Sequence, residues 1–285
     1  MNYRHAYHAG NFADVLKHVV LSRLIEYLKR KDKAFRVIDT HAGSGLYDLG
    51  ADEASRTAEW RDGIGRLIDA QLPAPIAPLL RPYLDAVRAQ NSRPELRYYP
   101  GSPLIARHLF RPQDRLSAIE LHPQEAEQLN ELFAGDFQVR VIELDGWLAL
   151  GAHLPPKEKR GIVLVDPPFE KEGEFGRLVD GLVKAHRRWP TGVYALWYPI
   201  KDMAAVRRFR EALSQTEIPK ILDVWQTVCG AGSEGLIGSG VIVVNPNFEL
   251  EGEMKLILPA LASALKRDKR ATFGLDWLAG EPRPA

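Results

Sequence analysis

The sequence predicts an α/β fold built on a seven-stranded, mostly parallel sheet with a small helical insertion. Seven short runs of apolar and β-branched residues have the length of buried strands. Most of these runs are apolar throughout rather than alternating, which is typical of parallel strands covered on both faces. Helical patterns separate most of them, and strands that alternate with helices favour an open, doubly wound sheet.

The expected elements can be placed in order along the chain. A first helix begins after Asn11, a good N-cap residue, and carries one apolar stripe from Val15 to Leu28. The expected strands are Phe35–Thr40, Leu116–Glu120, Val139–Leu144, Gly161–Val165, Val193–Trp197, Lys220–Thr227 and Gly240–Val244. The clearest helical patterns between them are Ser102–Phe110, Pro123–Phe133, Phe175–Trp189 and Asp202–Gln215.

One stretch of the chain breaks this alternation. Residues 48–97 contain helical patterns and proline-rich breaks but no convincing strand. We interpret them as a helical insertion subdomain. It would lie between residues 1–47, which supply the N-terminal segment, first helix and first strand, and residues 98–285, which supply the rest of the domain. The segment after Phe248 carries no motif, and no internal repeat is visible.

Composition excludes several classes of protein. The chain has 285 residues, of which 45% are hydrophobic and 26% charged, as in ordinary globular domains. No apolar stretch approaches the ~20 residues of a membrane span, and the first five residues lack the apolar core of a signal peptide. The single Cys229 excludes an internal disulfide and favours a reducing compartment. We expect a cytoplasmic monomer with no membrane contact.

The balance of charge does not identify a partner. Thirty-eight Lys and Arg residues face thirty-seven Asp and Glu residues, so net charge gives no argument for nucleic acid. Basic residues do cluster within 29–33, 157–160 and 187–188. Such runs are typical of solvated helix ends and loops.

The first expected strand ends in a glycine turn that favours a nucleotide ligand. Gly43 and Gly45 follow the strand, where glycine lets the backbone turn tightly and approach a ligand closely. A dinucleotide-binding turn would place a third glycine at position 48, which is Asp48, and would open directly into a helix. The sequence therefore disfavours a turn that binds the phosphates of a dinucleotide.

Acidic residues at the ends of the next two strands fit an adenosyl ligand better. Glu120 can accept hydrogen bonds from both ribose hydroxyls at the switch crevice. It lies 77 residues after Gly43 instead of the usual ~20, and the insertion accounts for the excess. Asp145, before Gly146, can accept from an adenine amino group. The alternatives are a strand-end Glu in solvent and an ordinary Asp-Gly turn.

The most informative motif is Asp166-Pro167-Pro168-Phe169, directly after a buried-type strand. The prolines stiffen the backbone and push Asp166 away from helical geometry. Asp166 and the Pro167 carbonyl can each accept one N–H of an amino group, which turns its lone pair toward a methyl donor. Phe169 offers a face on which a flipped-out base can stack. We assign Asp166 orientation and late proton acceptance; the alternative is a loop Asp that caps a helix.

Aromatic and cationic residues gather before the first strand. Tyr3, Arg4, His5, Tyr7 and His8, followed by Lys17-His18, suit stacking on bases and contact with phosphate. Together with His41 the segment brings four histidines, but no Cys or carboxylate stands at a known metal-ligand spacing. We therefore expect no metal.

With these residues in hand, the chain resembles the RlmJ family of bacterial 23S ribosomal RNA adenine-N6 methyltransferases over nearly its whole length. The resemblance is carried by Tyr3-Arg4-His5, His8–Asn11, Ala13–His18, Asp39–Gly43, Tyr98–Pro103, Glu120–Pro123, Asp145-Gly146, Asp166–Pro168 and Ala195–Pro199. One departure is Phe169, where the family motif often carries Tyr. The stacking face is kept, and only a phenol hydroxyl is lost.

The resemblance implies a Rossmann-like, class I methyltransferase with S-adenosylmethionine as donor and an adenine N6 in 23S ribosomal RNA as acceptor. It implies that Asp166 is catalytic and that Tyr3 meets the RNA; we add Arg4, Pro167 and Phe169 to the substrate side. The expected donor-binding residues are Lys17, His18, His41, Gly43, Ser102, Glu120, Asp145, Gly146 and Asp166.

Three other functions remain as alternatives. A DNA adenine-N6 methyltransferase would use the same chemistry, but it usually needs an element that reads the duplex grooves, and an insertion of about fifty residues is small for that task. A glutamine-methylating enzyme would favour Asn in place of Asp166. A non-catalytic nucleotide-binding protein would not need the acceptor carboxylate, the two prolines and the aromatic together.

Overall fold

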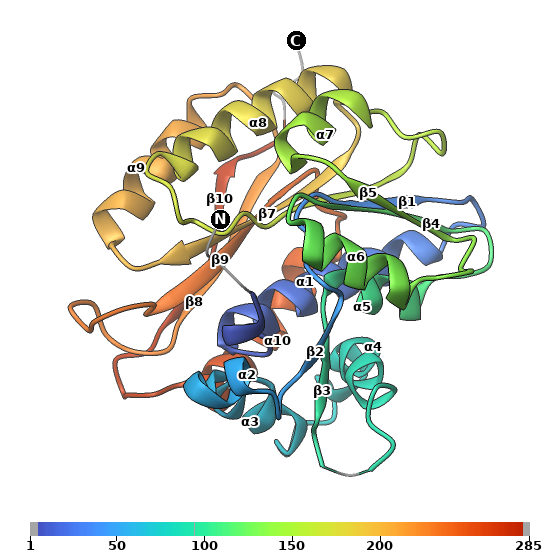
Figure 1. Cartoon of the computed structure of the whole chain (residues 1–285). Coiled ribbons are helices and arrows are strands. Elements are labelled where there is room, and N and C mark those ends of the chain that lie inside the picture. Colours follow the sequence, from blue (N-terminus) through green and yellow to red (C-terminus); the bar gives the residue numbers. More distant parts are fainter. Residues whose placement is uncertain (1–4, 94, 282–285) are drawn as a thin grey trace.

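The computed structural model describes residues 5–93 and 95–281, and it has helices on both faces of one central sheet (Figure 1). The sheet has eight strands in the order β10-β8-β9-β7-β6-β1-β4-β5. This arrangement confirms the predicted α/β class. Strand β1 lies between β4 and β6, so the chain crosses to opposite sides of β1, and the sheet is doubly wound.

The five strands from β5 to β7 in this order are parallel. Strand β9 runs antiparallel to β7 and β8, and β10 runs antiparallel to β8. The bounds are β1 Arg36–Asp39, β4 Arg115–Glu120, β5 Val139–Glu143, β6 Gly161–Val165, β7 Val193–Ile200, β8 Ile221–Thr227, β9 Gly238–Val244 and β10 Phe273–Ala279.

The prediction of seven strands was one too few. All seven expected strands are present, with bounds that differ by a few residues at most. The eighth is β10, an edge strand whose residues are exposed or only half-buried. An edge strand packs on few neighbours, so its sequence shows neither the continuous apolar run nor the clean alternation that marks a strand.

Helices cover the two faces of the sheet and enclose two separate apolar clusters. One face carries α1 (Phe12–Lys29), α5 (Ser102–Leu109), α6 (Pro123–Leu132) and α10 (Leu250–Leu265). The other face carries α7 (Gly146–Ala152), α8 (Glu174–Arg188) and α9 (Met203–Ser214). Figure 1 shows the second group above the sheet and the first group below it.

The segment between β1 and α5 is mostly helical. Two short strands, β2 (Leu46–Asp48) and β3 (Tyr98–Pro100), pair antiparallel at its base. Between them lie α2 (Asp52–Thr57), η2 (Glu59–Asp62), α3 (Ile64–Ile68) and α4 (Ala77–Arg88). The β2–β3 ribbon was not predicted, because three residues are too few to show a period. The helices pack on α1, α5 and α10 rather than on the sheet.

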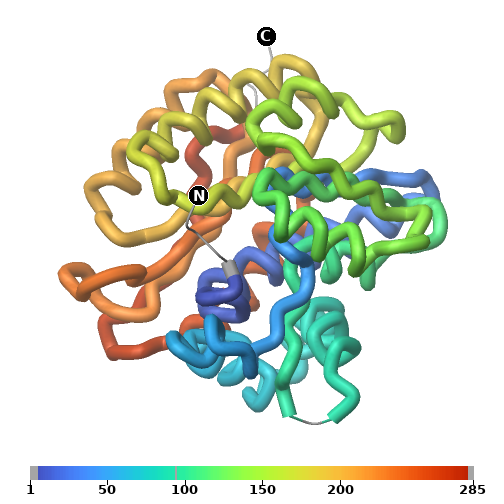
Figure 2. Tube along the Cα trace, in the orientation of Figure 1, coloured from blue at the N-terminus to red at the C-terminus, as the bar shows by residue number. Residues whose placement is uncertain are grey.

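Helix α1 is buried on nearly all sides, so the prediction of a single apolar stripe was wrong. The sheet covers one side of α1, and α4 and α10 cover the other; Figure 2 shows the blue trace of α1 between the sheet and the cyan trace of the insertion. The Asn11 cap was predicted correctly: its Oδ1 accepts from the N–H groups of Ala13 and Asp14, at 2.9 and 3.0 Å. Short 3₁₀ helix η1 (His5–Tyr7) precedes it.

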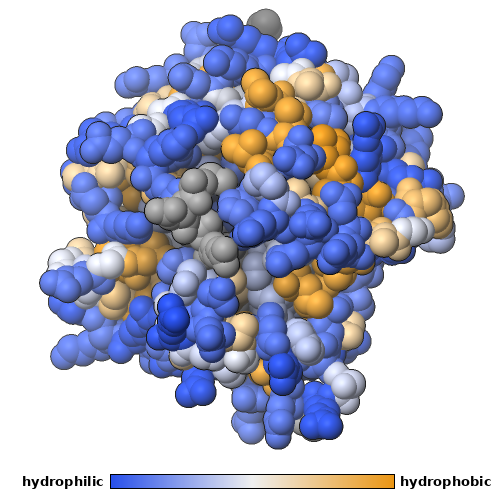
Figure 3. Space-filling view, viewed as in Figure 1, coloured by the Kyte–Doolittle hydropathy of each residue, from blue (hydrophilic) through white to orange (hydrophobic). Residues whose placement is uncertain are grey.

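The outer surface is largely hydrophilic on the face shown in Figure 3. Apolar surface gathers there over α7. The exposed apolar side chains of the chain include Leu148 in α7, which is 62% exposed, and Leu121 directly after β4, which is 48% exposed. Within residues 5–93 and 95–281, no helix has the length and apolar character that crossing a bilayer requires.

Candidate active site

Two cavities meet where the parallel strands end. The first, which we call the strand-end cavity, lies at the carboxyl ends of β1, β4, β5 and β6, and all nine of the expected donor-binding residues line it: Lys17, His18, His41, Gly43, Ser102, Glu120, Asp145, Gly146 and Asp166. The second, the aromatic cavity, is lined by His8, Asn11, Glu59, Phe169, Trp197, Pro199, Lys201 and Leu236, among others. Lys17, Asp166 and Pro168 line both.

Lys17 is buried between two carboxylates at the boundary of the cavities. Its Nζ lies 2.7 Å from Oδ1 of Asp14 and donates to Oδ2 of Asp166. The side chains of Lys17 and Asp14 are 3% exposed and that of Asp166 is 13% exposed. Burial acts to lower the pKa of Lys17, but attraction to Asp14 and Asp166 outweighs it and raises that pKa above its ordinary value. The ammonium therefore stays charged and fixes Asp166 in place.

Glu120 holds the glycine turn against the end of its own strand. Its Oε2 accepts from the N–H of Gly43 at 2.8 Å, and its Oε1 accepts from the N–H of His122 at 2.7 Å. Glu120 is 8% exposed, which contradicts the alternative of a solvated strand-end Glu. Gly43 has a φ of +60°, and a Cβ there would lie 2.1 Å from Oη of Tyr47. Only glycine fits this turn.

Asp145 and Gly146 bring helix α7 close to the end of β1. Asp145 caps α7 by accepting from the N–H of Trp147 at 2.9 Å. A Cβ on Gly146 would lie 2.1 Å from the backbone oxygen of Thr40 and 3.0 Å from the His41 ring, so the close approach requires glycine. The pair is thus a helix start packed against the cavity rather than an ordinary Asp-Gly turn.

His41 is half-buried and uncharged at neutral pH. Burial lowers the pKa of His41 to about 4, although Asp166 and Asp145 act to raise it. The Thr40 hydroxyl donates to the backbone oxygen of Leu164 at 3.0 Å and lies 2.8 Å from Nδ1 of His41. Because the hydroxyl proton is used on Leu164, Nδ1–H of His41 donates to Thr40, and Nε2 keeps a lone pair.

Asp39, the last residue of β1, adds a further carboxyl group beneath the cavity. It is 1% exposed, and burial raises the pKa of Asp39 to about 6. The Ser102 hydroxyl and the charge of Lys17 oppose that rise, and the charge of Asp166 adds to it. The carboxyl groups around Lys17 therefore influence one another, and the lysine is the cation that offsets them.

The loop after β6 does not serve as a helix cap. Helix α8 begins at Glu174 with Gly173 as its N-cap residue, so the alternative reading of Asp166 as a capping residue is wrong. Phe169 has a φ of +51°, a conformation that costs ~1–3 kcal/mol for a side chain other than glycine and that persists where the surroundings enforce it. Its ring packs edge-to-face on Phe175 and Trp197, with ring centres 5.1 and 5.7 Å away.

The aromatic cavity draws its wall from distant segments. Oε2 of Glu59, in the insertion, accepts from Nδ2 of Asn11 at 2.9 Å and lies 3.0 Å from Nδ1 of His8. Burial acts to raise the pKa of Glu59, but hydrogen bonds from His8 and Asn11 lower it below its ordinary value. Glu59 therefore ties the insertion to the chain that precedes α1.

The structure brings most predicted site residues together but leaves some predictions open. Tyr3 and Arg4 lie outside the described residues. Pro167 is buried, and it is the next residue, Pro168, that lines both cavities. In the described part of the chain, no three His, Cys, Asp or Glu side chains are grouped so that they could hold a metal ion.

Sequence reasoning missed several residues of the site. Asp14 stands three positions before Lys17, a helical spacing that could have identified the ion pair. Trp147 and Arg177 line the strand-end cavity, with the guanidinium 4.8 Å above the indole ring, and Glu59 and Trp197 line the aromatic cavity. Trp197 lies within the Ala195–Pro199 run quoted above, although no site role was assigned to it. No motif marks the other three, because tertiary packing alone brings them to the site.

The chain is similar to known proteins over nearly all of its length. A family model described as "Ribosomal RNA large subunit methyltransferase D, RlmJ" matches residues 32–279. The ribosomal RNA large subunit methyltransferase J of Escherichia coli is 43% identical, and that of Haemophilus influenzae is 41% identical; each match covers 99% of this chain and 100% of the relative. A crystal structure of a Legionella pneumophila protein superposes with a TM-score of 0.87 at 33% identity, covering 95% of this chain and 98% of the other.

Proposed function

The chain belongs to the RlmJ family of ribosomal RNA large subunit methyltransferases, and from this membership we infer that it transfers a methyl group from S-adenosylmethionine to the N6 amino group of an adenine in 23S ribosomal RNA. The observation that carries the proposal is the meeting of two unlike cavities at Asp166. One is suited to a nucleoside-containing donor and the other to a base. The acceptor carboxylate stands where they join.

The residues of the strand-end cavity fit an adenosyl donor. Glu120 keeps further acceptor capacity on both oxygens for ribose hydroxyls, since each accepts one backbone N–H in the structure. The positions of Gly43 and Gly146 admit no Cβ, which keeps the cavity wall close to backbone. Uncharged His41 adds no positive charge beside a cationic sulfonium. When bound, the donor supplies a methyl group already activated for transfer.

The chain's own task is to orient an amino group and to receive its proton. Lys17 donates to Oδ2 of Asp166, which leaves Oδ1 to accept an N–H from the substrate. Because Lys17 stays charged, it offsets the charge of the carboxylates of Asp14 and Asp166 beside it. The nitrogen becomes acidic only as it gains the methyl group, so a weak acceptor such as Asp166 is sufficient. Positioning supplies the remainder of the rate.

The aromatic cavity fits a base that has left its stack. Phe169 and Trp197 line it beside Asp166. An aromatic surface recovers part of the few kcal/mol that unstacking costs. The family supports RNA rather than DNA as the carrier of this base, and no feature of the described residues favours DNA. An enzyme that acts on ribosomal RNA would work in the cytoplasm, as the single cysteine led us to expect.

The test is transfer of a labelled methyl group to 23S ribosomal RNA, to duplex DNA and to ribosomal protein. We expect RNA alone to be labelled, as N6-methyladenosine. Asp166→Ala should lower single-turnover transfer by ~100-fold or more, while donor affinity changes only a few-fold, because the orientation of the nitrogen is lost. Labelled DNA or protein, or near-normal turnover of Asp166→Ala, would contradict the proposal.

A further inference from the structure

The edge of the sheet opposite the active site carries an excess of positive charge. The amino ends of β1, β4, β5 and β6 are formed by residues 31–36, 111–117, 137–140 and 153–160. These four segments, which we call the amino-edge surface, hold nine Lys and Arg residues and three Asp and Glu residues. That is a local excess of six in a chain whose net charge is +1. The near-neutral net charge of the whole chain therefore conceals a local excess of positive charge on the amino-edge surface.

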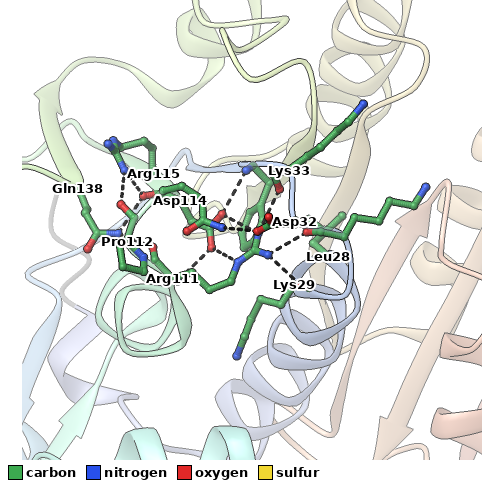
Figure 4. Close-up of polar contacts among 12 residues, drawn as sticks. Leu28, Lys29, Asp32, Lys33, Arg111, Pro112, Asp114, Arg115 and Gln138 are labelled. Carbon is green, nitrogen blue, oxygen red and sulfur yellow. Dashed lines mark hydrogen bonds and ion pairs between the residues drawn. The ribbon is translucent and has the colours of Figure 1, made fainter.

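Two of the three carboxylates of the amino-edge surface pair with arginines of the same surface. Asp114 is fully buried and pairs with Arg111 at 3.0 Å, and Glu158 makes a two-pronged pair with Arg36 at 2.9 Å. Arg111 also donates to the backbone oxygens of Lys29, Lys31 and Lys33, at 2.9, 2.8 and 3.0 Å, and stands at the centre of the network in Figure 4. Backbone carbonyl oxygens carry no net charge, so these hydrogen bonds do not neutralise the positive charge of Arg111.

The same network fixes the connection between α1 and β1 in a form that exposes its lysines. Lys31 and Lys33 are exposed, and among the described residues no carboxylate is paired with either. Arg160 donates to the backbone oxygen of Lys33 at 2.8 Å and adds its own charge. The arginines therefore act as a scaffold, and the exposed lysines remain available to an external anion.

A cavity lies within this surface, lined by Arg36, Arg115, Ser117, Arg140, His153 and Lys157. Arg140 and Lys157 are exposed and make no ion pair within the described part of the chain. Burial, together with repulsion from Arg140 and Arg36, lowers the pKa of His153. The cavity is thus a concave, cationic site, and none of the described residues that line it is acidic.

An exposed aromatic ring stands at the rim of this cavity. Phe137 is 75% exposed, and the guanidinium of Arg115 lies 5.4 Å from its ring centre. Arg115 donates to the backbone oxygens of Pro112 and Asp114, both at 2.8 Å, so its position is fixed. A fixed guanidinium over an exposed ring is a platform on which an unpaired base can stack.

We propose that the amino-edge surface binds the sugar–phosphate backbone of the RNA substrate at a point remote from the methylated adenine. The inference rests on the proposed function, because it takes the RNA to be the substrate. Strands of four to six residues separate this surface from the edge that carries Asp166, a span of about 13–20 Å. The surface therefore contacts a different segment of the RNA from the target base. It contributes to affinity and not to the chemical step.

The experiment compares Arg140→Glu/Lys157→Glu with Arg207→Glu/Arg208→Glu, which changes charge equally at exposed positions of α9. Binding of 23S ribosomal RNA is measured over a range of salt, and KM and kcat for methyl transfer are measured separately. For the first variant we expect KM to rise about tenfold or more with little change in kcat. The slope of log K against log salt should fall by about 1.4–1.8, the value for two phosphate contacts. The α9 control should match wild type.

Three results would overturn the proposal, and each is distinct from failure of the proposed function, which appears as absent methyl transfer by the wild type. Equal KM and salt slope in the two double variants would remove the surface from RNA binding. A fall in kcat at saturating RNA would show that the residues act on the active site. Binding to phosphatidylserine vesicles that is lost in the first variant, with RNA binding unchanged, would assign the surface to a membrane. The neutral Arg140→Gln/Lys157→Gln variant, with unchanged thermal unfolding, guards against misfolding and should give about half the effect.

Discussion

The two cavities that meet at Asp166 are built in different ways. The strand-end cavity takes most of its wall from the carboxyl ends of neighbouring parallel strands, together with one face of α1. The aromatic cavity takes its wall from the chain before α1, from η2 in the insertion, and from the ends of β6, β7 and the β8–β9 connection. One cavity is a property of the sheet, and the other is a property of how distant segments pack.

Because of this difference, the two cavities should tolerate different amino-acid substitutions. The strand-end cavity depends on two glycines: Gly146 lies against the backbone of Thr40, and Gly43 has a positive φ and lies against the Tyr47 side chain, so a larger residue at either position would disturb the wall. The aromatic cavity depends on side chains such as Phe169 and Trp197, which can be altered while the sheet stays in place. Substitutions should therefore separate donor binding from RNA turnover, except at the residues shared by both cavities.

The largest effect is expected at the shared wall, from Lys17→Met. The change leaves Asp14 and Asp166 as neighbouring buried carboxylates without their cation, which should cost ~3–5 kcal/mol of unfolding free energy. Lys255→Met is the control, because its pair with Glu251 is exposed and should be worth ~0.5 kcal/mol or less. Urea unfolding of both variants measures the difference. Equal shifts would mean that the Lys17 cluster is not a structural centre of the site.

A smaller effect, confined to the donor side, is expected from Glu120→Ala. Loss of a hydrogen bond to a charged group should weaken S-adenosylmethionine binding by ~1.5–3 kcal/mol. Glu143 occupies the matching position on β5, in register with Glu120, and is exposed, so Glu143→Ala is the control. Calorimetric titration of the donor distinguishes them. Unchanged donor affinity in a folded Glu120→Ala protein would remove this residue from the donor site.

The corresponding effect on the substrate side is expected from Phe169→Ala. Stacking on one ring is worth ~1–3 kcal/mol, so kcat/KM for RNA should fall by roughly 5- to 150-fold while donor affinity stays constant. Phe169→Tyr should be close to neutral because it keeps the face. Phe248→Ala, at a ring that is 82% exposed, provides the control. If Phe169→Ala methylates RNA at the wild-type rate, the ring is packing only.

The effect that is smallest at neutral pH concerns protonation of the strand-end cavity. With a folded pKa of about 4 against an ordinary 6.5, His41 should show no NMR titration between pH 6 and 8. Its folded pKa is lowered, so the unfolded chain binds the proton first, and stability should fall as pH drops from 6.5 toward 4. His41→Asn should remove that part of the pH dependence. A His41 resonance with a midpoint near 6.5 would show that the cavity is more open to water than the structure indicates.

The same difference explains how much the sequence could predict. Parallel strands bring their carboxyl ends to one edge, so residues after a strand, such as Glu120, Asp145 and Asp166, could be assigned to one site from the strand pattern alone. Glu59 and Trp197 could not, because nothing in their local sequence records which distant segments they meet. The seven predicted strands are recognisable because burial requires a run of apolar residues. Strand β10 was missed because its residues at the edge of the sheet are exposed or half-buried and need no such run. The parts proposed for Tyr3, Arg4 and the Pro167 carbonyl stay predictions.

Helix α1 also sets when the protein can become active during its synthesis. Its partners are among the last residues to be made: Arg23 pairs with Glu253 on α10, and Nε2 of Gln226 on β8 donates to the backbone oxygen of Phe12. A nascent chain that has just completed β1 lacks these partners, and at 5–20 residues per second it waits about 10–50 s for α10 to emerge. Until then Lys17 has no settled environment beside Asp166. A chain that has passed Asp166 but has not reached α10 therefore holds every strand-end carboxylate and still lacks a working active site. Translation itself delays activity until the polypeptide is nearly complete.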